Sequence, residues 1–453
     1  MLVVVLVYLG ALVAVGAAKA RSVRTQADFS LAGRRLSTFV LVGTLLATWI
    51  GTGSIFGLAE EAYVVGLPSL VIPLAEVAGI AVLFAIAGRA RRTEKVTVQD
   101  ILEERFGPAA RILGTLTLAI AYVVIVSYQY RAGAAVLERI LPEGIPGGHA
   151  TAVGAVALFV VLYTALAGMI SVAYTDVANG ILMTAGVAIA LPILLAKAGG
   201  WSEVTAALEP SGRALFGHYS FGGLLAVTLP SFLLLLGDAN LLTRFFSARD
   251  ARTARRATVA LLVGVFFLET AIMLLAIAGR ALLPGLQNPA HVVLEASFRI
   301  VHPALGALLV ATIVAIVVST ADSYLLAPSS SIARDVYQRF VRPDAPEREL
   351  VLAGRIFVVI LGAVALALAF QSEEFFSVAR FAYTIYGVGV TPVLLAALFV
   401  PRASPRGAVA AMGLAVSTAI AWRALGLEGT TGLHPVIPGF AISSGILLAT
   451  LRR

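Results

Sequence analysis

The chain has 453 residues, of which 59% are hydrophobic and only 13% are charged, and its mean hydropathy is +0.95. A water-soluble protein carries about 25% charged and roughly 45–50% apolar residues, so a soluble enzyme of this size is excluded. The net charge of +8 is more typical of a membrane protein, whose cytoplasmic loops carry an excess of Lys and Arg, than of a nucleic-acid-binding protein. The lack of cysteine excludes disulfides and thiolate metal sites.

Long apolar runs bounded by charged or turn residues follow one another along the whole chain. Each can cross a bilayer, since a spanning helix takes about 20 residues. They lie approximately at 2–18, 39–59, 70–87, 112–136, 152–167, 172–195, 221–236, 257–283, 305–326, 351–370, 381–399, 408–425 and 437–451. The ten-residue alternation of an outer-membrane barrel is absent. The sequence therefore predicts an all-α integral membrane protein with 13 transmembrane helices in one domain, residues 1–453.

The basic residues predict how the chain lies in the membrane. With the N-terminus outside, the segments on the inner side hold 25 of the 33 Lys and Arg residues, as the positive-inside rule requires. An odd number of spans then places the C-terminus in the cytoplasm. Residues 1–20 could instead be a signal peptide cleaved near Ala18-Lys19-Ala20, but a retained first helix is favoured because no basic residue precedes the apolar run. We expect a multi-pass protein of the inner (plasma) membrane.

Charged residues inside the predicted spans are candidates for function, because a charge at the bilayer centre costs about 2.5–3.5 kcal/mol on insertion scales. They are Glu76, Arg131, Asp176, Asp238, Glu269 and Asp322. Structural alternatives remain open for three of them. Asp238 could sit at a helix end, Glu269 could form a salt bridge with Arg131, and Asp176 could cap a helix.

The segment 315–324 concentrates hydroxyl groups around a carboxylate. Ile316, Ser319, Thr320 and Ser323 are three or four residues apart and share one helix face, with Asp322 beside it. Such a cluster of hard oxygen atoms suits a small hard cation. The alternative is that the hydroxyls bond back to the preceding turn, which would leave Asp322 unexplained.

A second segment, 47–54, contains two glycines that could interrupt a span. Gly51 and Gly53 could instead form a helix-packing face. A comparable interruption is expected at Leu229-Pro230-Ser231, five spans later. Interrupted helices at matching positions of two halves indicate a transport site at a repeat interface.

These segments belong to a wider resemblance that covers essentially the whole chain. It is carried by Phe29-Ser30-Leu31-Ala32-Gly33-Arg34, Ala47-Thr48-Trp49-Ile50-Gly51, Gly168-Met169-Ile170-Ser171-Val172-Ala173-Tyr174-Thr175-Asp176, Arg244-Phe245-Phe246-Ser247-Ala248, Ser319-Thr320-Ala321-Asp322-Ser323 and Ser329-Ser330-Ser331-Ile332-Ala333-Arg334-Asp335-Val336-Tyr337. With these motifs the chain resembles the sodium:solute symporters, which include the sodium/proline, sodium/pantothenate and sodium/glucose carriers. Two positions depart from the family pattern. Ala167-Gly168 replaces a glycine pair, and Asp322 stands where some members have a hydroxyl residue.

The resemblance implies a LeuT-like five-plus-five inverted repeat. Its halves would be residues 38–196 and 220–400, with one flanking helix in 1–37 and two in 401–453. It implies a main sodium site at Ala47, Ile50, Ile316, Ser319 and Thr320. A second sodium site of some members would map to Asp176, Ser319, Asp322 and Ser323. The solute would contact Thr52, Gly53, Glu76 and Ser231, while Arg244 is expected to be a structural residue on the cytoplasmic side.

The leading prediction is a sodium-coupled secondary active symporter that imports a small polar organic solute by alternating access. The solute could be an amino acid, a carboxylate or a sugar-like compound, and the expected partners are this solute, Na⁺ and the lipid bilayer. No enzyme activity, nucleic acid or obligate protein partner is expected. Three alternatives remain open: proton coupling through Asp322 or Asp176, a non-transporting membrane sensor on a transporter scaffold, and an ion channel, for which no charge ring or repeated filter sequence is visible.

Overall fold

The structure is a computed structural model that describes residues 1–20, 26–141, 145–371 and 374–451, and it is built from helices. The first half contains α1 (Leu2–Ala20), α2 (Gln26–Leu31), η1 (Ala32–Arg34), α3 (Thr38–Trp49), η2 (Gly53–Leu58), α4 (Ala59–Val65), η3 (Leu67–Leu70), α5 (Val71–Arg92), α6 (Val98–Phe106), α7 (Pro108–Ile140), α8 (Gly148–Lys197), α9 (Trp201–Ala206) and η4 (Pro210–Gly212). The second half contains α10 (Phe221–Gly237), α11 (Ala239–Ser247), α12 (Ala251–Leu282), η5 (Pro289–His291), α13 (Val292–Arg299), α14 (Pro303–Ser331), η6 (Ile332–Val341), α15 (Glu347–Leu368), α16 (Phe375–Gly389), α17 (Thr391–Phe399), α18 (Pro405–Ala424), α19 (Leu427–Thr431) and α20 (Val436–Ala449).

Each predicted apolar run coincides with one helix or with adjoining helices. Within the described ranges, 10 helices are long and apolar enough to cross a membrane, or up to 11 when the bent pair Thr38–Trp49 and Gly53–Val65 is counted as one span. The first and last predicted runs form shorter apolar helices, Leu2–Val15 and Val436–Ala449. The all-α membrane architecture is therefore confirmed, while the count of 13 crossings stays a prediction.

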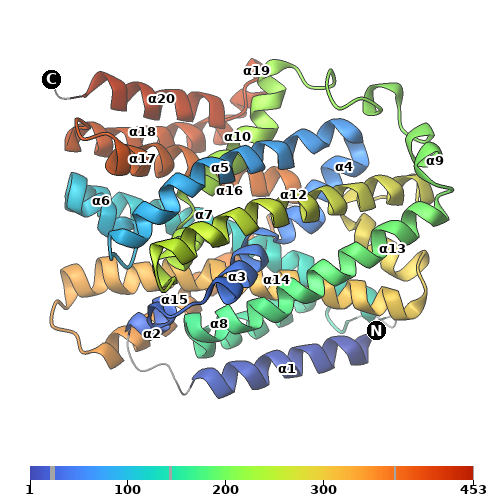
Figure 1. Cartoon of the computed structure of the whole chain (residues 1–453), viewed down its shortest axis with the longest axis horizontal. Coiled ribbons are helices and arrows are strands. Elements are labelled where there is room, and N and C mark those ends of the chain that lie inside the picture. The colour runs from blue at the N-terminus through green and yellow to red at the C-terminus, as the bar shows by residue number, and fades with distance from the viewer. Residues whose placement is uncertain (21–25, 142–144, 372–373, 452–453) are drawn as a thin grey trace.

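The long helices run side by side along one direction (Figure 1). Figure 1 also shows the N-terminus at the same end of the molecule as α9 and α13, while α6 and the C-terminus lie at the opposite end. Helix α14 is the most buried of the candidate spans and packs against α7 and α8. Its Ser-Thr-Ala-Asp-Ser segment therefore lies in the interior of the bundle.

Two interruptions follow from local backbone chemistry. Gly168 adopts φ 68° and ψ 170° and kinks α8, dividing it into the two candidate spans Gly148–Leu166 and Ser171–Lys197. Glycine tolerates this positive φ because it has no Cβ. The kink lies in the expected 168–171 turn.

The interruption expected at Pro230 is wrong, because α10 continues through this residue. A proline inside a helix leaves the carbonyl four residues earlier without its N–H donor. Here that carbonyl, of Ala226, accepts a hydrogen bond from Arg380 Nη1 at 3.4 Å. The chain instead turns at Asp238, with φ −55° and ψ 120°. The Asp238 side chain accepts from Leu241 N at 2.8 Å and so caps α11, which supports the helix-end interpretation of Asp238.

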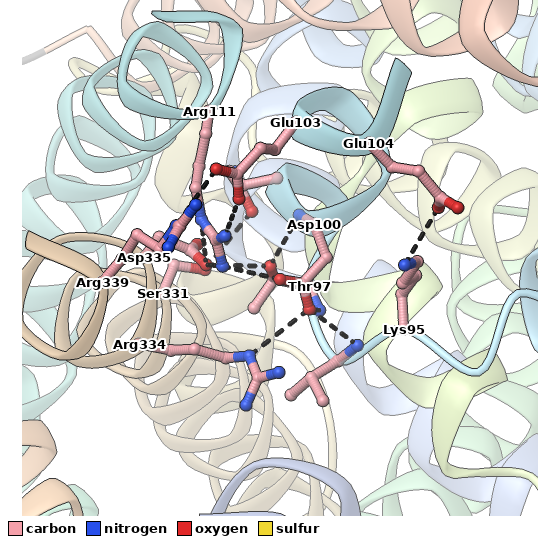
Figure 2. A network of polar contacts seen from close by, with 12 residues as sticks. Lys95, Thr97, Asp100, Glu103, Glu104, Arg111, Ser331, Arg334, Asp335 and Arg339 are labelled. Atoms are coloured by element: carbon pink, nitrogen blue, oxygen red, sulfur yellow. Dashed lines mark hydrogen bonds and ion pairs between the residues drawn. The ribbon is translucent and has the colours of Figure 1, made fainter. Parts of the chain in front are cut away.

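The basic segment 89–111 was expected to be a loop, but it contains α6. Thr97 and Asp100 form a reciprocal capping box at the start of α6, a pattern visible in the sequence as Thr-x-x-Asp. Figure 2 shows that α6, the start of α7 and η6 are joined by charged side chains around Arg111. This contact fixes α6 against the bundle.

Candidate functional site

The predicted break in the second span is present. Helix α3 ends at Trp49, Ile50 has ψ 88°, and the helix that follows is bent by 50°. The last carbonyls of an interrupted helix lack their helical N–H partners. The Ala47 carbonyl accepts a hydrogen bond from the Ser319 hydroxyl at 2.9 Å. The break therefore brings a main-chain oxygen of α3 against the hydroxyl cluster of α14.

Thr320, the second hydroxyl of the predicted sodium site, lies at the same place. A Cβ added to Gly51 would approach Thr320 Oγ1 to 3.0 Å, so glycine allows the two elements to come together. Thr320 is 2% exposed, and its Oγ1 has no hydrogen-bond partner within the described residues. A buried hydroxyl without a partner is costly, so this oxygen is available to bind a ligand. Ile316 lies in the regular part of α14, so its carbonyl would offer an ion its second lone pair.

Asp176 joins this cluster from the second half of α8. Its Oδ1 accepts from Ser319 at 2.8 Å, and its Oδ2 accepts from Thr44 at 2.6 Å. It also forms a buried salt bridge of 3.1 Å with Arg244. These partners come from three other helices, so Asp176 connects helices and is not a simple helix cap.

Arg244 was expected to be a structural residue on the cytoplasmic side, and the structure places it inside the bundle. Its side chain is fully buried, and besides Asp176 it donates to Thr44 Oγ1 at 2.8 Å and to Ser323 Oγ at 2.8 Å. The sequence analysis did not predict this contact with Asp176 and Ser323, because Arg244 begins a run of basic residues. A signal was available in the pair Phe245-Phe246, both fully buried, which separates Arg244 from the basic residues that follow.

The residues of the predicted second sodium site lie together around this guanidinium. Ser323 donates to Asp322 Oδ1 at 3.2 Å and accepts from Arg244. Contacts of 3.1, 2.8 and 3.2 Å thus connect Asp176 to Asp322 through Arg244 and Ser323. Asp322 is 1% exposed. The sequence predicted that these residues lie together, but it did not predict that the Arg244 guanidinium lies among them.

A separate pocket lies beside the broken helix. Its lining residues are Trp49, Gly53, Ser54, Leu58, Ile72, Glu76, Val227, Ser231, Leu234, Glu269, Tyr324, Phe376, Ala379, Arg380 and Tyr383. It includes three of the four predicted solute contacts. The fourth, Thr52, is fully buried and donates to Gln129 Oε1; it is not among the lining residues. The cavity volume is about 30 Å³, which suits water-sized groups, so a solute requires its walls to move apart.

The sequence interpretation missed several polar lining residues of this pocket. Trp49 Nε1 donates to Glu76 Oε2 at 2.7 Å, and Ser54 donates to Glu269 Oε1 at 2.9 Å. Glu269 interacts electrostatically with Glu76, so its environment includes a second carboxyl group. The sequence signal for Glu269 was its place inside an apolar span.

Comparisons with known proteins agree with this geometry. The profile of the Sodium:solute symporter family matches residues 29–414. The chain is 28% identical to a sodium/proline symporter of Haemophilus influenzae, covering 92% of this chain and 87% of that protein. It is also 28% identical to the high-affinity proline transporter PutP of Bacillus subtilis, covering 92% and 90%.

Solved structures show the same fold. A Na⁺-coupled sialic acid symporter in a substrate-bound outward-open state superposes with a TM-score of 0.85 at 17% identity, covering 99% of this chain and 96% of that one. The nucleobase-cation-symport-1 family transporter Mhp1, closed around bromovinylhydantoin, gives a TM-score of 0.66 at 14% identity, covering 93% of both chains. The family and these structural neighbours are transporters and not enzymes. The chain therefore belongs to the sodium:solute symporter family and is a multi-span membrane transporter.

Proposed function

We propose that this protein is a sodium-coupled symporter that imports a small polar organic solute. The observation that carries the proposal is the break in the second span, where the Ala47 carbonyl contacts Ser319 and the buried Thr320 hydroxyl has no hydrogen-bond partner within the described residues. Unwound backbone carbonyls at such a break are typical ligands for a coupling sodium ion. The family membership and the sodium/proline symporters among its relatives support the same coupling ion.

The main sodium site consists of the carbonyls of Ala47, Ile50 and Ile316 with the hydroxyls of Ser319 and Thr320. Two of these groups, Ala47 and Ser319, already contact each other across the helix interface. Five oxygen ligands without a carboxylate suit a monovalent hard cation. Sodium would give Thr320 Oγ1 a partner, and it has none within the described part of the chain.

Arg244 takes the place of a second sodium ion in this proposal. Its guanidinium contacts both Asp176 and Ser323, two members of the second predicted site, and supplies a fixed positive charge there. When ionised, Asp176 and Asp322 carry one negative charge more than Arg244 balances. A single sodium ion next to Ser319 restores neutrality, so we propose one coupling ion per transport cycle.

The direction of coupling follows from the membrane potential. One positive charge that moves down the potential yields about 2.3 kcal/mol per 100 mV. The N-terminus is proposed outside and the C-terminus in the cytoplasm, in agreement with their positions at opposite ends of the molecule (Figure 1). The 13 helices then form a flanking helix in 1–37, inverted repeats in 38–196 and 220–400, and two final helices in 401–453, all in a bacterial-type plasma membrane.

Uptake by proteoliposomes tests the coupling ion. L-Proline is the first solute probe, because two relatives that cover most of the chain are proline transporters. An inward sodium gradient at constant pH should drive accumulation, and an inside-negative potential should increase it. An inward proton gradient in sodium-free potassium buffer should not. Accumulation driven by protons without sodium would contradict the proposal and favour proton coupling through Asp322 or Asp176. Sodium-dependent stabilisation without uptake of any solute would favour the sensor alternative.

A further inference from the structure

A second cavity, separate from the pocket beside the broken helix, lies where the ends of α5, α6 and α17 meet. Its volume is about 420 Å³, within the range of roughly 300–1,000 Å³ that is usual for ligand sites. None of its lining residues belongs to the proposed sodium or solute sites. The lining combines charged with apolar side chains, among them Arg89 and Arg92 of α5, Ile101, Glu104 and Arg105 of α6, and Leu398 of α17.

This lining carries an excess of positive charge. Its carboxylate, Glu104, already forms a salt bridge of 2.9 Å with Lys95 (Figure 2). Arg89, Arg92 and Arg105 form no ion pair within the described residues. Three guanidiniums without a carboxylate partner favour an anion as the occupant of the cavity, because a guanidinium matches carboxylate and phosphate geometry.

The end of α17 holds two of these guanidiniums in position. Arg89 Nη1 donates to the Leu398 carbonyl at 3.4 Å, and Arg105 Nη2 donates to the Val400 carbonyl at 3.3 Å. A guanidinium has five N–H donors, so both side chains keep donors for a further acceptor. Within the described part of the chain, the Arg92 side chain makes neither a hydrogen bond nor an ion pair. The cavity therefore has donors available from both α5 and α6.

The cavity lies at the level where lipid headgroups are expected. Arg89 and Arg92 end the candidate membrane span Leu67–Arg92, and the ends of a span lie at the membrane–water interface. Two apolar rings flank them: Phe84 of α5 is 42% exposed, and Phe399 is 40% exposed with its ring centre 4.5 Å from the Arg89 guanidinium. In a bilayer, exposed apolar side chains of a span contact lipid acyl chains. Positive charge and apolar surface thus lie side by side.

Two general explanations account for part of this arrangement. Basic residues in the last turn of α5 interact favourably with the helix dipole, and arginines after a span are typical of its cytoplasmic end. Neither effect brings guanidiniums of two different helices to one cavity with an apolar flank. A ligand that is anionic at one end and apolar at the other accounts for both features.

We propose that this cavity binds the phosphate of an anionic phospholipid, with the acyl chains against Phe84 and Phe399. Arginine pairs with phosphate through charge-assisted, often bidentate hydrogen bonds, and basic pockets between transmembrane helices bind lipid headgroups. The apolar flank favours a membrane lipid over a free phosphate ion. The bound headgroup connects the ends of α5, α6 and α17, so the lipid stabilises the folded chain by mass action.

Thermal unfolding of the purified full chain in a non-ionic detergent tests the proposal. The protein is titrated with dioleoyl phosphatidylglycerol, with dioleoyl phosphatidylcholine and with inorganic phosphate, at one pH and one ionic strength. The two lipids have the same acyl chains and differ in headgroup charge. We expect phosphatidylglycerol to raise the unfolding temperature at a concentration at least about fivefold lower than phosphatidylcholine, and inorganic phosphate to have little effect at that concentration.

Arginine-to-glutamine variants locate the lipid. Arg92→Gln should weaken binding of phosphatidylglycerol about fivefold, and Arg89→Gln combined with Arg92→Gln about 25-fold, because each basic residue near an anionic lipid contributes about a factor of five. Arg92→Gln should leave the stability without lipid unchanged, since its side chain has no polar contact in the described ranges. Arg406→Gln is the matched control, because Arg406 is an exposed arginine at the start of α18 that does not line the cavity. Its affinity for phosphatidylglycerol should equal that of the unmodified chain.

The other outcomes overturn the proposal in distinguishable ways. Equal stabilisation by the two lipids, or by neither, would show that no anionic headgroup is recognised. Stabilisation by inorganic phosphate at the same concentration as phosphatidylglycerol would indicate a soluble anion site. Equal weakening in Arg92→Gln and Arg406→Gln, or unchanged binding in the double variant, would show that the lipid is attracted by the whole basic surface and does not bind in this cavity.

Discussion

Arg111 and Arg244 are both buried arginines, yet their surroundings differ. Arg111, whose side chain is 7% exposed, forms salt bridges with three carboxylates, of Asp100, Glu103 and Asp335 (Figure 2). Arg244 is fully buried and has one carboxylate partner, Asp176; its other side-chain partners are hydroxyls. The two sites have similar chemistry but different degrees of charge compensation.

The charge balance separates a structural network from an ion site. Around Arg111, two further arginines, Arg334 and Arg339, pair with Asp100 and Glu103, so three carboxylates meet three guanidiniums. Around Arg244, one guanidinium forms an ion pair with Asp176 and interacts electrostatically with Asp322, so two carboxylates share a single guanidinium. Buried atoms without a hydrogen-bond partner within the described residues occur in both networks, at Thr320 Oγ1 and at Asp335 Oδ2, so the charge balance alone separates them. We infer that the complete network stabilises the fold, whereas the incomplete one admits a mobile cation.

The largest expected effect on uptake is at the break between α3 and η2, beside the site around Arg244. A Cβ at Gly53 would collide with the Tyr383 hydroxyl, so Gly53→Leu should abolish uptake while the protein still inserts and folds. Leucine is a good helix former, which limits the cost to the helix itself. Uptake per folded molecule in proteoliposomes measures this effect.

The matched control for the break is Gly154→Leu, since nothing lies within 4 Å of a Cβ at Gly154. This variant should retain normal uptake per folded molecule. Normal turnover in Gly53→Leu would show that the glycine serves helix packing alone and would remove the break from the transport site.

Arg111→Met should give the largest loss of stability. Removing one member of a buried ion network leaves unpaired carboxylates and costs about 3–5 kcal/mol. The sodium concentration for half-maximal uptake should stay unchanged among the folded molecules, because the side-chain partners of Arg111 are Asp335, Glu103 and Asp100, none of which belongs to the hydroxyl cluster. Thermal unfolding and a sodium titration of uptake provide the two readouts. A changed sodium requirement at constant stability would contradict the structural role.

The sequence predicted the hydroxyl cluster, the break at Gly51 and the grouping of Asp176 with Asp322. Each is encoded locally, by helical spacing around Ser319 or by glycines inside an apolar run. Such sites are easy to recognise in the sequence of a membrane protein, because polar residues are rare in its apolar spans.

The role of Arg244 could not be read in the same way, because its burial depends on partners from three other helices, Thr44, Asp176 and Ser323. The prediction of a helix break at Pro230 is wrong for a related reason. Its local tendency to break a helix is offset by the donor Arg380, which lies 150 residues further along the chain. Long-range contacts of this kind leave no periodic signal.

Ser319→Ala combined with Thr320→Ala should have an intermediate effect. The double variant removes both side-chain ligands of the proposed sodium site and should raise the half-maximal sodium concentration about fivefold to 150-fold, if each ligand contributes roughly 0.5–1.5 kcal/mol. Stability without sodium should fall by about 1–3 kcal/mol, because Ser319→Ala removes the buried donor to the Ala47 carbonyl and to Asp176. Ser330→Ala is a control hydroxyl on the same helix, α14. An unchanged sodium requirement in the double variant would remove this site assignment.

The smallest effect is expected at the edge of the Arg111 network, where Lys95 and Glu104 form a salt bridge of 2.9 Å (Figure 2). The Glu104 side chain is 66% exposed, so solvent screens this pair and it contributes roughly 0.2–1 kcal/mol at most. Glu104→Gln should therefore shift the unfolding temperature only slightly, and the shift should vanish at high salt because screening weakens exposed charges. Arg111→Met should keep most of its destabilisation under the same conditions, because buried charges are screened much less. Equal salt sensitivity of the two variants would show that the network around Arg111 is solvated and would remove the distinction between a complete structural network and the incomplete site around Arg244.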